Sequence, residues 1–595
     1  MKKKFLWLFV SCLMALSLVV VSCGTAEVEE EEEEQEVVEE EEVESADRPK
    51  YGGTLTTAIV RDPGNWDTQA SPAGGQAYGS GRIYEQYMTS DWTRGAAGSN
   101  VVFWPPGSSS LEDYYYPQLA ESWENPDQST WILNIRQGVH WQEVDSDAGR
   151  IMGGREMTVD DIIYSFNRSK DLKSSWVNVA QPAGAAAMTI EKTGPWQVTI
   201  KVPLEPLAIW FFMIQGGGHG NVFPREVIEE FGNLLDWRNA VGTGPFMLED
   251  FVSASSVTLT RNPDHWDRNP VGPGKGDQLP YVDKFIELVI ADTSTQIAAL
   301  RTGKVDMLSG VARELALQLI GENNDMQYVK YLGNIPWIIG MRTDKEDLPF
   351  HDIRVRQAMM MATDFQTLKD DLYDGDAEID VIPWNKNFAE SFTPLSEQPQ
   401  AVQDLYSYNP ERAKELLTEA GYPDGFKAKV TSSNGPVEVD DLSLFKDMWA
   451  KVGIDLEIEP LEYGAFNTIV TTRSHDELLY RFSWRIFPVL YYFAGIRGAN
   501  WDNSSYTNDP PGSDSYIESV FEDVQRNAVS NMPAVYQSFK EMQTYLMEQA
   551  RVIPRPTPYT YNMWQPWVKD YHGEGGTRFL RYHWIDTELK ESMGY

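Results

Sequence analysis

Hydrophobic and polar side chains alternate in several short stretches of the chain, which is the period of a strand with one face in a core. The stretches are Trp131, Leu133 and Ile135; Val198, Ile200 and Val202; Val257 and Leu259; and Ile454, Leu456 and Ile458. Each of them predicts a β-strand that is buried on one side.

Apolar positions three and four residues apart predict helices elsewhere. The clearest helix has Asn409 as its N-cap and Pro410 in its first turn, and it ends at Gly421. Two longer helices are expected over residues 354–373 and 533–551. Because predicted helices and strands interleave along the chain, we expect an α/β fold with mixed sheets.

The N-terminal segment has the order of a bacterial export signal. Three lysines at positions 2–4 precede an apolar run over residues 5–21, and a small residue stands before Cys23. We interpret residues 1–22 as a lipoprotein signal peptide and Cys23 as the residue that is acylated, which anchors the mature protein outside the cytoplasm. An uncleaved membrane helix is the alternative, because about 17 apolar residues are at the short end of what spans a bilayer.

An acidic segment follows the predicted anchor. Residues 27–44 contain 13 glutamates, whose mutual repulsion opposes collapse, so residues 23–49 are predicted to form a disordered linker. With +3 on residues 1–26, the total charge of −39 leaves −29 on residues 45–595. Such an acidic body argues against nucleic acid as a partner.

The sequence offers no catalytic or metal-binding pattern. Its seven histidines are scattered without the spacing of metal ligands, so we expect no metal and no cofactor. The glycine-rich stretch 216–220 is not followed by the Lys-Ser/Thr pair of a phosphate loop, and no G-x-S-x-G elbow is present. A secreted hydrolase is therefore a minor alternative, for which we find no nucleophile or acid/base pair.

Seven stretches together carry a family pattern. They are 51–55 (YGGTL), 117–123 (PQLAESW), 131–141 (WILNIRQGVHW), 158–166 (TVDDIIYSF), 242–246 (GTGPF), 301–306 (RTGKVD) and 352–358 (DIRVRQA). In these stretches the chain resembles the extracellular solute-binding proteins of family 5, the dipeptide- and oligopeptide-binding receptors of ABC importers.

The resemblance implies an α/β clamshell, the large three-subdomain form of the type II periplasmic-binding-protein fold, with two lobes joined by a two-crossing hinge. The predicted divisions are 50–77, 221–336 and 566–595 for lobe I, 78–220 for a subdomain inserted in lobe I, and 337–565 for lobe II. Closure of the lobes would bury a solute and present it to an ABC permease in the cytoplasmic membrane. The resemblance also implies a monomer without enzymatic activity.

Six residues are candidates for contact with the solute. They are Trp484, Tyr463, Arg481, Arg485, Trp384 and Trp66. The resemblance implies that Tyr463 and Trp484 are aromatic residues of lobe II that face the cleft, and Arg481 matches a basic residue of some peptide receptors. Packing in a core is the alternative for each of these, and an exposed position is the alternative for Arg485.

One departure from the family pattern bears on the solute. Peptide receptors of the family place an aspartate shortly after the tryptophan that matches Trp484, where it pairs with the ligand's α-amino group. Here no acidic residue occurs before Asp502, and a buried ammonium without a carboxylate costs several kcal/mol. We therefore expect a peptide or similar small organic solute that is not captured through its amino terminus in the usual way.

Two alternatives keep the same fold. An oligosaccharide receptor is favoured by the aromatic content, 20 Trp and 28 Tyr, because sugars are neutral and stack on rings. A sensory or adhesive surface protein, in which closure signals to another receptor, is the second.

Overall fold

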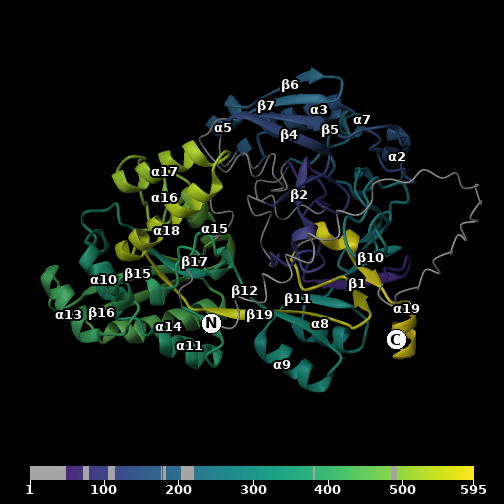
Figure 1. The fold of residues 1–595 in the computed structure, drawn as a ribbon. Coiled ribbons are helices and arrows are strands. Elements are labelled where there is room, and N and C mark those ends of the chain that lie inside the picture. The colour runs from purple at the N-terminus through teal and green to yellow at the C-terminus, as the bar shows by residue number, and fades with distance from the viewer. Residues whose placement is uncertain are drawn as a thin grey trace, which may run out of the picture. The chain divides into compact units, whose positions relative to one another are not determined.

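The computed structural model describes residues 48–70, 79–104, 114–175, 177–178, 182–202, 220–379, 382–483, 492–575 and 577–595. Within these residues the backbone forms three sheets of four or more strands, with helices between them in sequence (Figure 1). The residues from Asp47 to Tyr595 belong to one compact unit.

An eight-stranded sheet collects strands from distant parts of the chain. In spatial order they are β12 (Gln327–Leu332), β19 (Thr557–Trp564), β11 (Met307–Val311), β1 (Thr54–Ile59), β10 (Lys284–Val289), β9 (Ser256–Arg261) and β8 (Phe246–Val252), with β14 (Ala377–Glu378) paired to β19. Strand β1 is parallel to β10 and β11, whereas β19 is antiparallel to β11 and β12. Helices α8 (Thr293–Arg301) and α9 (Arg313–Glu322) follow β10 and β11 in the chain.

A four-stranded antiparallel sheet is inserted in the chain between β1 and β8. Its order is β4 (Ala120–Asp127), β5 (Thr130–Ile135), β7 (Gln197–Lys201) and β6 (Thr189–Gly194). The helices of this part of the chain are α2 (Asp147–Met152), α3 (Val159–Asp171), α5 (Pro182–Ala187) and α7 (Arg225–Phe231). Thr158 and Asp161 form a capping box that fixes the start of α3.

The five-stranded sheet has the order β16 (Ile454–Leu461), β15 (Phe426–Ser433), β17 (Leu478–Phe482), β13 (Trp337–Met341) and β18 (Val552–Pro554). Strands β15, β16 and β17 are parallel, and β13 is antiparallel to both of its neighbours. The helices of this region are α10 (Ile353–Met361), α11 (Phe365–Tyr373), α12 (Gln400–Leu405), α13 (Pro410–Glu419), α14 (Pro436–Ala450) and α15 (Tyr463–Thr472).

Three helices lie in the chain between β17 and β18: α16 (Phe493–Ile496), α17 (Ser515–Asn527) and α18 (Met532–Gln549). Their buried side chains include Phe521, Val524 and Phe539, and these belong to the same apolar cluster as Trp131 and Leu133 of β5. One continuous core therefore includes residues of α17, α18 and the inserted sheet.

The remaining elements are short. They are β2 (Met88–Ser90), β3 (Tyr115–Pro117), β20 (Val568–Lys569), β21 (Trp584–Ile585), α19 (Thr587–Ser592) and the 3-10 helices Trp92–Arg94, Trp237–Asn239, Pro349–His351, Lys386–Phe388, Leu395–Glu397 and Thr577–Tyr582.

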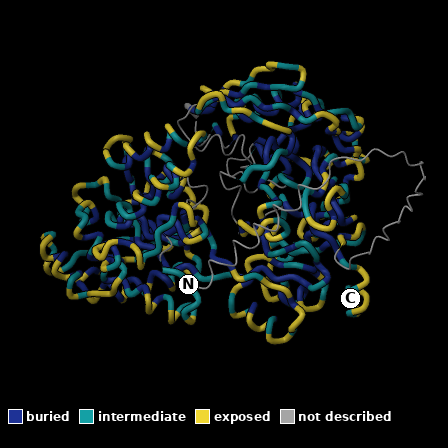
Figure 2. The backbone as a smooth tube through the Cα atoms, viewed as in Figure 1, coloured by how far each residue is buried: buried dark blue, intermediate teal, exposed yellow. Residues whose placement is uncertain are grey.

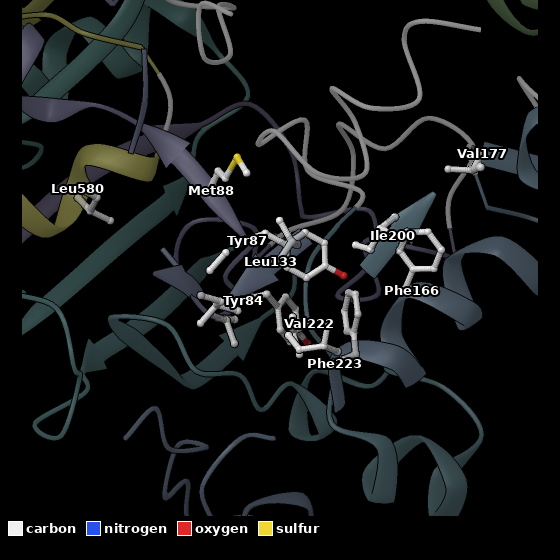
Figure 3. Close-up of a cluster of buried hydrophobic side chains, with 14 of the residues drawn as sticks. Tyr84, Tyr87, Met88, Leu133, Phe166, Val177, Ile200, Val222, Phe223 and Leu580 are labelled. Carbon is white, nitrogen blue, oxygen red and sulfur yellow. The ribbon is translucent and has the colours of Figure 1, made fainter. Parts of the chain in front are cut away.

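Burial follows most of the strands, which are largely buried or intermediate, whereas β4 and β6 of the inserted sheet and many helix and turn positions are exposed (Figure 2). Figure 3 shows part of the largest core, in which Tyr84 and Phe223 lie beside each other with ring centroids 4.8 Å apart. Among the described residues, no helix has the length and apolar content needed to cross a membrane.

Apart from the two-residue strand β14, which lies between β13 and β15 in the chain and pairs with the start of β19, the chain passes twice between the eight-stranded and the five-stranded sheet. The first passage lies between Leu332 at the end of β12 and Trp337 at the start of β13, and the second lies between Pro554 and Thr557. The two passages are joined, because the backbone N–H of Arg555 donates to the carbonyl oxygen of Trp337 at 2.9 Å.

Most of the periodicity predictions are confirmed. The four alternating stretches form β5, β7, β9 and β16, and the helix predicted after Asn409 is α13, whose N-cap side chain accepts from the N–H of Arg412. The prediction of one helix over residues 354–373 is wrong. The chain forms α10 and α11 instead, because Asp364 caps a new helix by accepting from the N–H of Thr367.

Candidate functional site: the carboxyl edge of the five-stranded sheet

The parallel strands of the five-stranded sheet end at one edge. Helix α14 leads from the end of β15 to β16, and α15 leads from the end of β16 back to β17 on the other side of β15. The strand order thus reverses at β15. In open α/β sheets a ligand lies outside the carboxyl ends of the strands at such a switch point, so this edge is the candidate site.

The end of β15 is polar and tightly bonded. The hydroxyl of Ser433 donates to Glu438 Oε1 at 3.0 Å, and the hydroxyl of Ser432 donates to the carbonyl oxygen of Ser433 at 3.0 Å. The N–H of Asn434 donates to the carbonyl oxygen of Leu461 at 2.8 Å, which ties the ends of β15 and β16 together. The edge is therefore a rigid platform.

Two large apolar side chains are exposed where the helices leave this edge. Tyr463, the first residue of α15, is 62% exposed, and Val437, near the start of α14, is 59% exposed. Glu462 fixes the start of α15, because its carboxylate accepts from the N–H groups of Gly464 and Ala465. The predicted residue Tyr463 thus lies at the carboxyl end of β16, the outer strand next to β15, with its ring exposed.

Arg481 lies near the carboxyl end of β17 and is only 3% exposed. Its Nη2 donates to Asp502 Oδ1 at 2.6 Å, its Nε donates to the carbonyl oxygen of Phe482 at 2.9 Å, and its guanidinium stands 5.1 Å from the Trp501 ring centroid. Because Asp502 neutralises Arg481 inside the protein, this arginine adds no net charge to the edge.

The next residues along the chain reach the hinge. The N–H of Ser483 donates to the carbonyl oxygen of Pro336 in the first passage between the sheets, at 2.7 Å. Trp484 and Arg485 follow Ser483 in the sequence, and both lie outside the described residues, as does Cys23. Most of the glycine-rich stretch 216–220 also lies outside them.

The other two predicted residues lie away from this edge. Trp384 is 1% exposed, its Nε1 donates to the carbonyl oxygen of Ser391 at 2.8 Å, and its ring packs edge-on against Tyr492 and Phe539. Trp66 is buried and packs edge-on against Phe251 of β8. The structure therefore brings Tyr463 and Arg481 to one edge and places Trp384 and Trp66 in cores.

A buried ion pair stands at the second passage and was not predicted. Arg555 pairs with Asp441 of α14, and the hydroxyl of Tyr480 donates to Asp441 Oδ2 at 2.7 Å. Burial would lower the pKa of Arg555, but Tyr480 and Asp441 more than offset it and raise the pKa above its ordinary value. No sequence spacing indicates this group, because its members are far apart in the chain.

The described residues contain no group of three or more His, Cys, Asp or Glu side chains arranged to hold a metal ion. The eight-stranded and the five-stranded sheet are joined by two chain passages, and a subdomain is inserted between β1 and β8 of the eight-stranded sheet. This arrangement is the clamshell of periplasmic binding proteins. The fold is similar to that of the DppA periplasmic binding protein of Helicobacter pylori in complex with the peptide STSA, with a TM-score of 0.67, 20% identity and coverage of 90% of this chain and 99% of that chain.

The sequence matches the profile of the bacterial extracellular solute-binding proteins, family 5, over residues 114–504, and the chain belongs to this family. It is 24% identical to heme-binding protein A of Haemophilus influenzae over 506 residues, which cover 80% of this chain and 82% of that protein. It is 25% identical to the glutathione-binding protein GsiB of Salmonella paratyphi A over 354 residues, 58% of this chain and 61% of that protein.

Family membership confirms that the chain belongs to a class of extracytoplasmic binding proteins and that it is not an enzyme. Proteins of this family are extracytoplasmic solute-binding components of ABC transporters, so the chain is a binding protein and not an enzyme. The hydrolase alternative is thereby excluded.

Proposed function

We propose that this protein is the lipid-anchored receptor of an ABC importer, which closes two lobes around a peptide or a similar small organic solute and delivers it to the permease. The match to the solute-binding family over residues 114–504 carries the proposal. The exposed ring of Tyr463 at the carboxyl edge of the five-stranded sheet supports it, because a ligand that lies there has an aromatic face to contact.

The proposed division is into lobe I, its insertion 78–220 and lobe II, with the return to lobe I placed between Pro554 and Thr557 rather than near residue 566, because β19 pairs with β11 and β12 of the eight-stranded sheet. Residues 1–22 are the signal peptide, Cys23 carries the lipid, and the acidic linker up to residue 49 holds the body away from the membrane. Metabolic labelling with a fatty-acid analogue tests the anchor. Label should enter the wild type and be absent from Cys23→Ala, and equal labelling of both would contradict the proposal.

The solute is proposed to lack a free ammonium group at the lobe II edge. No acidic residue occurs from Trp484 to Trp501, and Asp502 is paired with Arg481. Peptide-type solutes are supported by the relatives, one of which is named for glutathione and another of which was solved with a tetrapeptide. An oligosaccharide is the second candidate, favoured by the same lack of an acidic residue from Trp484 to Trp501 and by the exposed aromatic ring of Tyr463.

Equilibrium titration tests the function. The purified full chain is titrated with peptides that carry free termini, the same peptides with acetylated and amidated ends, and neutral oligosaccharides, and tryptophan emission is followed. Saturable binding with preference for end-blocked peptides or sugars is expected. Preference for the free amino terminus would overturn the solute assignment, and no response to any solute would overturn the receptor assignment.

A further inference from the structure

The turn between β4 and β5 contacts the corner between α17 and α18, about 400 residues further along the chain. Gln128 stands in this turn, and its Nε2 donates to the carbonyl oxygen of Arg526 at 2.9 Å and to Ser530 Oγ at 2.7 Å. Its Oε1 accepts from the N–H of Val529 at 3.1 Å. Both ends of one side-chain amide are therefore engaged with the α17–α18 corner.

The two sides of this contact belong to different halves of the clamshell. Strands β4 and β5 form part of the sheet inserted between β1 and β8, whereas α17 and α18 lie between β17 and β18 of the five-stranded sheet. The contact is thus a connection between the halves in addition to the two chain passages.

The backbone groups that bond to Gln128 lie at the end of α17, where they have no partner within the helix. Arg526 lies in the last turn of α17, where carbonyl oxygens have no partner within the helix. The N–H of Val529 lies beyond the end of α17 and is likewise outside the helical ladder. Gln128 therefore completes the C-terminus of α17 from the opposite half of the molecule.

The turn that carries Gln128 is fixed before it meets α17. Asp127 accepts from the N–H of Ser129 at 2.8 Å and from its hydroxyl at 2.9 Å, and Thr130 Oγ1 donates to Asp127 Oδ2 at 2.9 Å. The hydrogen bonds from Ser129 hold the pKa of Asp127 below its ordinary value. A pre-formed turn loses little conformational freedom when it docks.

Apolar packing accompanies the amide contact. Val524 and Ala528 of the α17 end are buried in the same cluster as Trp131 and Leu133 of β5, and Val529 packs against that cluster. Gln128 thus bonds to the backbone of Val529, whose side chain packs against this core.

We propose that Gln128 is a latch between the halves of the clamshell, and that it sets the equilibrium between open and closed forms whatever the solute is. The proposal rests on the proposed two-lobed receptor. The latch requires that this contact forms in the closed form and breaks in the open form. Such a contact shifts the equilibrium toward closure by its own free energy, even when no solute is present. The solute-free protein therefore keeps a closed population that depends on Gln128.

Distances between spin labels measure this population without any solute. The full chain in detergent carries Cys12→Ser and Cys23→Ser, which remove both natural cysteines. Glu191→Cys of β6 and Glu522→Cys of α17 then provide the two thiols that are labelled. Both label positions are exposed, one on the inserted sheet that carries Gln128 and the other on the helix that Gln128 contacts. Pulsed electron resonance then resolves a short and a long distance for the closed and open forms.

Gln128→Ala should reduce the ratio of short to long distances about tenfold, because three partly exposed hydrogen bonds are lost. Gln128→Glu keeps the shape and the acceptor for Val529 but loses both donations, so it should reduce the ratio by a similar amount. Ser530→Ala removes one partner and should reduce it about twofold. The control is Gln537→Ala, a glutamine on the exposed face of α18 that bonds only within its helix among the interactions described.

An unchanged distance distribution in Gln128→Ala would overturn the latch, and so would a Gln537→Ala effect of equal size. Neither result depends on solute binding. A protein that binds no solute but shows the Gln128-dependent shift would refute the proposed receptor function and leave the latch standing.

Discussion

Two buried arginine–aspartate pairs of the five-stranded sheet have the same chemistry and different surroundings. Arg555 and Asp441 join the second passage between the large sheets to helix α14, with Tyr480 as a third member. Arg481 and Asp502 lie instead near the carboxyl edge of β17, beside the candidate ligand position. The first pair joins the second passage to the body of the sheet, whereas the second pair leaves the candidate site without the net charge of Arg481.

The largest effect is expected at the hinge pair. Asp441→Ala leaves the Arg555 guanidinium in a site where its side chain is 10% exposed, and removal of one partner from a buried pair costs about 3–5 kcal/mol. Urea denaturation should show this loss in the free energy of unfolding. The control is Asp145→Ala, whose exposed pair with Arg150 should contribute less than about 1 kcal/mol. Equal losses of unfolding free energy in both variants would show that the Arg555–Asp441 pair contributes no more to stability than an exposed pair.

The loss at the edge pair should be smaller, and it should also change solute selectivity. Asp502→Asn leaves Arg481 positively charged with its bonds to backbone carbonyl oxygens intact, so unfolding should become easier by about 2 kcal/mol. Affinity should shift toward solutes that carry a carboxylate. Titration with a neutral peptide amide and the matching peptide acid checks this, and an unchanged ratio of the two affinities would refute the role of the pair.

A pH effect of similar size is expected from His475, which precedes the amino end of β17, the end away from the hinge. Burial and the charge of Arg342 lower the pKa of His475 to about 4. Between pH 6.5 and 4 the unfolded chain binds a proton that the folded protein refuses, so stability falls as the pH is lowered through this window.

The contribution of His475 is at most about 3 kcal/mol over that window. His475→Gln should flatten the pH dependence of the unfolding free energy, while replacement of the exposed His140 by glutamine should leave it as in the wild type. The measurement is urea denaturation at a series of pH values. A slope that persists in His475→Gln would assign the effect to other groups.

The smallest effect on stability is expected at Tyr463, because its ring is 62% exposed. Tyr463→Ala should change the free energy of unfolding by less than about 0.5 kcal/mol, and it should weaken solute binding about tenfold. Tyr408→Ala, another exposed tyrosine, is the matched control and should leave affinity unchanged. Equal affinities of the two variants would remove Tyr463 from the site.

Local signals in the sequence predict the local elements well. Asn409 and Gly421 bracket α13, and the alternation from Ile454 to Ile458 gives β16. The break between α10 and α11 was missed, because the apolar pattern continues through Asp364 while the cap of a new helix overrides it. Capping residues inside a periodic stretch are the signal that would have shown the break.

The site was predictable only in part. Tyr463 was placed from family resemblance, and the structure adds that it lies at the carboxyl edge of the parallel strands, after the outer strand β16. The partners of Arg555 and Arg481 were not predictable, because they come from other segments, 114 and 21 positions away. Gln128 is separated from its partners by about 400 positions, and nothing in the sequence around it distinguishes it from other polar turn residues. Contacts of this kind depend on the assembled fold.

Small-angle X-ray scattering of the full chain during a solute titration tests the central claim most directly. If the protein functions by closing two halves on a bound molecule, its radius of gyration falls in proportion to the fraction of protein that is occupied. A radius that stays constant while tryptophan emission reports saturation would contradict the account.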